Sequence, residues 1–127
     1  MVWEENSRIC LHMQLNAILS RIGVDFLLAV GGGSVIDSCK AISSGRFYQG
    51  DVWTLYEHKD HATQYLPIGC ILTIPAAGSE MSNGSVITND EVESWLKKDY
   101  CVDEFRCKFA IMNQELTSTW LQAFTPY

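Results

Sequence analysis

The chain has 127 residues, of which 47% are hydrophobic and 19% are charged, and its formal net charge is −6. This composition excludes an intrinsically disordered chain and is typical of one globular domain, which we expect to span residues 1–127. The acidic balance and the lack of a basic patch exclude nucleic acid as an expected partner. The apolar runs at 26–30 and 68–75 are far shorter than the ~20 residues of a membrane-spanning helix, so no membrane contact is expected.

The cysteines and the start of the sequence predict a cytoplasmic protein. The five cysteines are an odd number without a Cys-x-x-Cys pair, which indicates reduced thiols. Residues 1–6 are acidic and lack the basic-then-apolar pattern of a signal peptide.

The first predicted elements are a helix and a strand. Apolar residues recur at steps of mostly three and four over residues 8–22, which predicts an amphipathic helix that ends at Gly23. Residues 26–30 are all apolar and predict a short strand. Because this strand shows no alternation, we expect it in a parallel sheet that is covered on both faces. The order helix, strand, glycine turn, helix is typical of an α/β fold.

A glycine turn and a second helix follow this strand. Ser34 is a good helix N-cap, and Asp37 stands three residues later, where a capping-box acid belongs. Helical spacing of apolar residues predicts a helix over 34–44. A strand, Gly31 to Gly33 and a helix start together direct free N–H groups at one point, which favours an anion such as a phosphate.

The rest of the chain gives weaker signals. Asp51 predicts the cap of a short helix over 51–56, and residues 68–74 predict a second buried strand. A loop of small residues follows at 76–80, and 85–88 and 109–112 are candidate strands. The charged segment 91–108 gives no clear prediction.

The two loops favour a phosphate-bearing ligand. Ligands of open α/β sheets bind at the carboxyl ends of strands, where both the glycine turn and the loop at 73–80 are expected to lie. The turn lacks the third glycine of G-x-G-x-x-G, because Ile36 stands at that position, and it is not a P-loop. A tight turn without a ligand is the alternative interpretation.

Two other groups of residues allow a functional and a plain interpretation. His58 and His61 have the spacing of metal ligands on a helix, but their polar surroundings favour a solvated loop. Lys97 is either a solvated surface residue or a cation close to a ribose or phosphate.

Residues 26–40 and 67–80 closely resemble the iron-containing (group III) alcohol dehydrogenases, with the NADPH-dependent butanol dehydrogenase and aldehyde reductase group as the nearest branch. The resemblance implies a partial Rossmann-like dinucleotide-binding domain with a parallel sheet and NAD(P) as cofactor. It places Gly32, Gly33 and Ser34 at the pyrophosphate, Asp37 beside the cofactor, Thr73 and Ser79 in the second loop against the cofactor, and Lys97 near the ribose.

The sequence also departs from the family pattern. Ala77 replaces the usual Thr of the second loop, and Gln114 stands where Pro is common. In the family, a helical C-terminal domain carries an Asp and three His that bind iron or another divalent metal. None of His12, His58 and His61 matches these ligands, so we expect no metal site and no catalytic residue in this chain.

The resemblance predicts the NAD(P)-binding portion of an enzyme that moves a hydride between the nicotinamide and a small alcohol or aldehyde. A homodimer is one possible assembly. The alternative is a non-catalytic, truncated product that binds nucleotide weakly or only associates with a partner subunit. A related fold that acts on glycerol or a sugar phosphate is a third interpretation.

Overall fold

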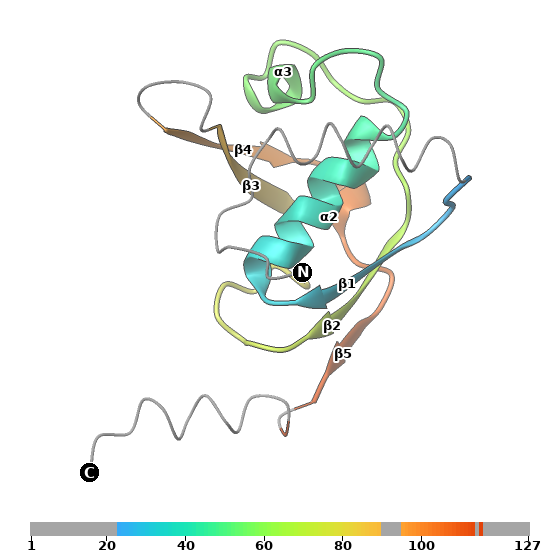
Figure 1. The fold of residues 1–127 in the computed structure, drawn as a ribbon, viewed down its shortest axis with the longest axis vertical. Coiled ribbons are helices and arrows are strands. Elements are labelled where there is room, and N and C mark those ends of the chain that lie inside the picture. Colours follow the sequence, from blue (N-terminus) through green and yellow to red (C-terminus); the bar gives the residue numbers. More distant parts are fainter. Residues whose placement is uncertain (1–22, 90–94, 114, 116–127) are drawn as a thin grey trace.

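In the computed structural model, residues 23–89, 95–113 and 115 are described (Figure 1). The helix predicted over 8–22 and Cys10 lie outside these residues. In chain order, the elements are β1 (Leu27–Gly31), α2 (Gly33–Gly45), α3 (Trp53–Tyr56), β2 (Ile68–Leu72), β3 (Gly84–Asn89), β4 (Leu96–Cys101), a 3-10 helix (Asp103–Phe105) and β5 (Ala110–Met112).

The predicted parallel sheet is confirmed. Strands β1, β2 and β5 pair in parallel in the order β1-β2-β5, with Ala29 opposite Cys70 and Cys70 opposite Ala110. Strands β3 and β4 form a separate antiparallel hairpin in which Ser85 lies opposite Tyr100. Helix α2 contacts both the parallel sheet and the hairpin, and Figure 1 shows it between them. The predicted α/β class with a parallel sheet is therefore correct.

Only one face of the sheet is buried under α2. Leu27 and Ala29 point to this face and are 9% and 1% exposed, because they pack with residues of α2 and β2. Leu28 and Val30, on the opposite face, are 50% and 55% exposed. The prediction that both faces are covered is therefore wrong in the described part of the chain, although an all-apolar strand is the pattern that a fully covered sheet requires.

An aromatic core lies beyond α2. It joins α3, the hairpin and the 3-10 helix, and Tyr100 packs edge-on against Phe105. Its fully buried aromatic members are Tyr56 and Phe105. The charged segment 91–108, which gives no clear prediction from the sequence, contains β4 and the 3-10 helix, and both contribute to this core. Only Tyr100 of β4 is buried, so the strand has little hydrophobic pattern to reveal it.

The predicted cap of α2 is wrong. The helix begins at Gly33 with Gly32 as its N-cap, and no side chain caps it. Asp37 accepts a hydrogen bond from β3 instead of the helix start. The Asp51 prediction is closer, because its carboxylate accepts the Trp53 N–H at 2.9 Å, although α3 is shorter than predicted. Cys39, Cys70, Cys101 and Cys107 are free thiols, as predicted.

Candidate functional site

The carboxyl ends of the three parallel strands lie along one edge of the sheet. Strand β1 ends at Gly31, β2 at Leu72 and β5 at Met112. Gly32 and α2 follow β1, and the segment 73–83, here called the β2–β3 loop, follows β2. The parallel order therefore brings together the two loops that the sequence singled out, at the edge where α/β proteins bind ligands.

The two loops lie close together, most tightly at Gly33. The Thr73 N–H donates to the Gly31 carbonyl at 3.0 Å. A Cβ on Gly33 would lie 3.2 Å from the Ser79 hydroxyl, and a Cβ on Gly32 would lie 3.8 Å from Ile74 Cβ. A side chain at either glycine would therefore extend toward the β2–β3 loop, and its absence leaves the backbone of the turn accessible.

Gly78 gives the β2–β3 loop its shape. Its φ of +70° lies in the left-handed region, which favours glycine. Its carbonyl accepts the N–H groups of Met81 and Ser82, both at 3.1 Å. This turn places Ser79, which is 6% exposed, against the glycine turn and α2.

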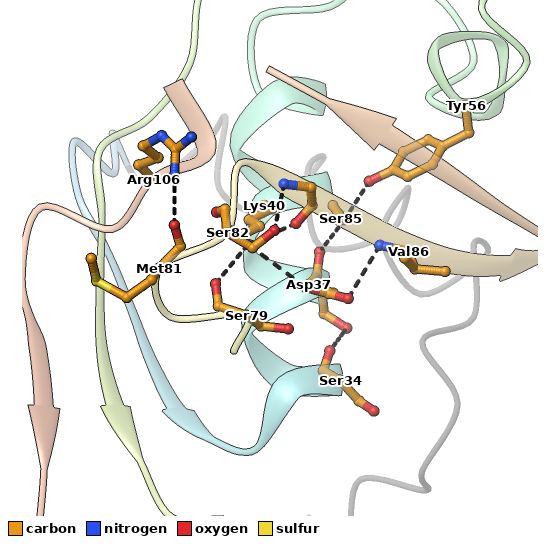
Figure 2. Close-up of polar contacts among 12 residues, drawn as sticks. Ser34, Asp37, Lys40, Tyr56, Ser79, Met81, Ser82, Ser85, Val86 and Arg106 are labelled. Carbon is orange, nitrogen blue, oxygen red and sulfur yellow. Dashed lines mark hydrogen bonds and ion pairs between the residues drawn. The ribbon is translucent and has the colours of Figure 1, made fainter. Parts of the chain in front are cut away.

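Asp37 lies between the two loops and β3 (Figure 2). Its Oδ2 accepts the Val86 N–H at 3.2 Å, and its main-chain carbonyl accepts the Ser85 hydroxyl at 2.8 Å. Its Oδ1 is buried and accepts no hydrogen bond from the described residues. Burial raises the pKa of Asp37, and the Val86 N–H, the Lys40 and Lys97 ammonium groups and the Ser79 side chain partly offset that rise. A buried oxygen without a donor is costly, so Oδ1 is a suitable acceptor for a ligand N–H or O–H.

Lys40 is a functional candidate that sequence reasoning missed. It is fully buried, and its ammonium donates to the carbonyls of Ser79, Ser82 and Gly84 at 2.8, 3.0 and 2.7 Å. Burial lowers the pKa of Lys40, and the Asp37 charge opposes that shift. The available signal was that Asp37 and Lys40 are the sole charged residues of α2 and are three positions apart.

The other predicted residues divide into two groups. Gly32, Gly33, Ser34, Thr73 and Ser79 all belong to the two loops or the start of α2, so the structure brings them to one edge. Lys97 lies on β4 and is exposed, yet it is close enough to Asp37 to lower the pKa of that carboxyl. The helix start adds the positive end of the helix dipole, and the N–H groups of Val35 and Ile36 are bonded there to the Gly32 carbonyl.

A third strand end also reaches this edge. Asn113 follows β5, and its side-chain oxygen accepts the Glu115 N–H at 3.0 Å. The carboxyl end of β5 belongs to the same edge as those of β1 and β2. It lies next to β2, because β5 pairs with that strand.

Neither a metal site nor a membrane span is found in the part of the chain that the structure describes. His58 and His61 lie in an exposed segment, and no group of three or more His, Cys, Asp and Glu residues in the described ranges could hold a metal ion. The described residues therefore do not fit the metal expected for the family. No helix within these ranges is long and apolar enough to cross a membrane.

Comparison with known proteins gives consistent results at the level of sequence. A Bacillus subtilis protein named "Probable NADH-dependent butanol dehydrogenase 1" is 49% identical over 90 residues, which are 71% of this chain and 23% of that protein. The chain thus spans about a quarter of the length of the curated relatives that it matches.

Solved structures agree with the fold. NADH-dependent butanol dehydrogenase A from Thermotoga maritima superposes with a TM-score of 0.81 at 32% identity, over 86% of this chain and 27% of that one. Sulfoacetaldehyde reductase from Bifidobacterium kashiwanohense, solved with NAD+, superposes with a TM-score of 0.82 at 27% identity, over 91% of this chain and 30% of that one. These likenesses confirm the Rossmann-like class.

The model of one family matches nearly the whole chain. It is described as iron-containing alcohol dehydrogenase, and it matches residues 2–114. The match includes the glycine turn, α2, the β2–β3 loop and all three parallel strands. The resemblance seen in the sequence is thereby confirmed, and the chain belongs to the iron-containing alcohol dehydrogenase family.

Proposed function

We propose that this chain forms the dinucleotide-binding part of an oxidoreductase that interconverts a small alcohol and its aldehyde with NAD(P). The observation that carries the proposal is the meeting of the glycine turn and the β2–β3 loop beside Asp37 Oδ1, which accepts no hydrogen bond from the described residues. The relatives support the cofactor class, because the Thermotoga protein is named NADH-dependent and the Bifidobacterium structure contains NAD+.

The start of α2 is the proposed pyrophosphate site. Gly32 and Gly33 present backbone without side chains, and Ser34, which is exposed, adds a hydroxyl on the first turn. The positive end of the helix dipole and the N–H groups of the first turn attract a phosphate. Because this turn carries no acidic residue, nothing in it opposes the negative charge.

The remaining residues orient the rest of the cofactor. In the proposal, Asp37 accepts a hydrogen bond from the cofactor at Oδ1, and Thr73 and Ser79 contact the cofactor from the β2–β3 loop. Lys97 supplies positive charge from β4 close to the ribose. These contacts would fix the position of the nicotinamide, because several short polar contacts define an orientation better than one charge does.

In the proposal, the cofactor and the protein chain have different roles. When bound, the nicotinamide supplies the hydride chemistry, and this chain binds and orients it. The described residues do not fit a metal ion, so no step is assigned to one. The alcohol or aldehyde substrate and a homodimeric assembly belong to the same proposal.

Calorimetric titration of the full 127-residue chain with NADH and with NADPH tests this function. We expect saturable binding of at least one of them, and much weaker binding of inorganic pyrophosphate, because pyrophosphate reaches only the helix start. Gly32→Val should stay folded, since the new Cβ has 3.8 Å to Ile74 and φ is −87°. It should nevertheless weaken dinucleotide binding more than tenfold, which is about 1.4 kcal/mol. Absence of binding to a folded wild-type chain would overturn the proposal.

A further inference from the structure

We propose that Lys40 is a positioning residue that holds the β2–β3 loop in its cofactor-binding conformation and leaves Asp37 Oδ1 without a hydrogen bond among the described residues. This inference rests on the proposed function, because it assigns a purpose to the loop. Lys40 lies in the second turn of α2, and Figure 2 shows its side chain beside Ser82 of the loop.

The hydrogen bonds of Lys40 account for its whole donor capacity. An ammonium group has three N–H donors and no acceptor. The three acceptors are the carbonyls of Ser79 and Ser82 in the loop and of Gly84 at the start of β3. One side chain therefore fixes both ends of the segment 79–84, and Ser79 is held against Gly33.

This arrangement also determines what Asp37 can do. Lys40 Nζ lies 3.9 Å from Asp37 Oδ1, close enough for charge attraction but longer than a hydrogen bond. Because the carbonyls occupy the three donors, Lys40 stabilises the carboxylate without taking its acceptor. Oδ1 consequently stays without a hydrogen bond among the described residues.

The burial of Lys40 argues against a role in general stability alone. A buried ammonium costs free energy that an apolar side chain of similar volume does not. Elsewhere on the same helix, Ser43 links α2 to the segment before β2 through one neutral hydrogen bond, from its hydroxyl to the Leu66 carbonyl at 2.7 Å. Lys40 instead binds the β2–β3 loop, which carries the predicted cofactor contacts Thr73 and Ser79.

The test compares Lys40→Met with Ser43→Ala in the full chain. Both residues are fully buried on α2 and donate to backbone carbonyls, but Ser43 is bonded to the segment before β2. Both variants should lose stability. Lys40→Met should also weaken NADH binding at least tenfold at a temperature where circular dichroism shows a folded chain, whereas Ser43→Ala should bind within twofold of wild type. Equal NADH affinities for wild type and Lys40→Met would overturn the proposal.

Hydrogen exchange separates this inference from the proposed function. Without cofactor, the amides of Met81 and Ser82 should exchange at least tenfold faster in Lys40→Met than in wild type. The exchange rate of the Cys70 amide, which is hydrogen-bonded within the sheet, should change much less between the two proteins. If wild type binds no dinucleotide but these amides exchange faster in Lys40→Met, the proposed function fails, and the role of Lys40 in holding the loop stands. Unchanged exchange in Lys40→Met would overturn that role of Lys40 whatever the binding result.

A second variant and a measurement on wild type test the same role of Lys40 if Lys40→Met does not fold. Lys40→Gln keeps two N–H donors without the charge, and it should show an intermediate rise in exchange. If neither variant folds, the 15N NMR signal of the wild-type Lys40 ammonium gives the result. Its protons should exchange with water at least tenfold more slowly than those of Lys59, which is 68% exposed. Equal rates would show that the three bonds do not hold.

Discussion

Helix α2 has two differently built sides. Its sheet side is apolar, where Ile36 packs with Ala29, Cys70 and Leu72. Its loop side is polar, where Asp37 and Lys40 bond to β3 and the β2–β3 loop. Burial of apolar area is non-directional and supplies most stability, whereas hydrogen bonds require defined positions. The sheet side of α2 therefore holds the fold together, and the loop side defines the geometry of the proposed site.

The largest expected effect comes from the apolar side. Ile68 is fully buried at the amino end of β2, away from the loops. Ile68→Ala should lower the free energy of unfolding by about 2–5 kcal/mol, because it removes buried methyl groups and leaves a cavity. Urea unfolding measures this change, and NADH affinity per folded molecule should stay within twofold.

The conservative Ile68→Val variant is the control, with an expected cost of about 0.5–1.5 kcal/mol. A large loss of NADH affinity in folded Ile68→Ala would contradict the separation of the two sides of α2.

Two glycines with almost the same φ, one in the β2–β3 loop and one outside it, separate the effect of backbone strain from that of loop shape. Gly78 has φ +70° and Gly23 has φ +67°, and a Cβ would meet no atom within 4 Å at either position. Alanine at each should cost about 1–2 kcal/mol in the left-handed region, measured by thermal or urea unfolding. Only Gly78→Ala should also weaken NADH binding, by several-fold, because Gly78 shapes the β2–β3 loop. Equal binding by the two variants would remove the loop from the site.

The pH dependence of stability tests the polar side. Burial raises the pKa of Asp37 above 3.8, so the folded protein binds this proton more tightly than the unfolded chain does. The contribution of Asp37 to stability therefore falls as pH rises from about 3.8 through its folded-state pKa. Asp37→Asn removes that titration. The difference in unfolding free energy, wild type minus Asp37→Asn, should decrease across this window and then level off.

Urea unfolding over a pH series from below 3.8 to neutrality measures that difference. A difference that rises with pH would mean that Asp37 is stabilised as an anion in the fold, contrary to its burial and to the lack of a hydrogen bond at Oδ1 among the described residues.

The smallest effect is expected at Lys97. It is exposed, so its attraction for a bound dinucleotide is screened by water and salt. Lys97→Gln should weaken NADH binding by less than about 1 kcal/mol, with a smaller loss at high salt. Its neighbour Lys98 is the matched control, since it lies over the Trp53 ring and 3.5 Å from Glu57. An equal loss in Lys98→Gln would place neither lysine at the site.

Much of the parallel half of the fold was predictable. The strand expected at 26–30 is Leu27–Gly31, and the helix expected at 34–44 is Gly33–Gly45. The strands expected at 68–74 and 109–112 are present with shorter bounds. These elements are compact apolar runs or clear helical patterns between glycines and prolines. Strand β4 escaped prediction because its Lys and Asp residues hide a pattern with one buried side chain.

The elements of the parallel sheet, the glycine turn and the family were predictable from the sequence alone, because these depend on local pattern and on motifs. Only the tertiary structure decided the partners of the charged side chains. Asp37 stood in the position of a capping-box acid and is bonded to β3, and Lys40, which no sequence pattern singled out, is buried and bonded to three carbonyls. The acceptors of Lys40 lie 39 to 44 residues away in sequence, so no local pattern could reveal them. Directional bonds between distant segments exist only once apolar packing has brought those segments together.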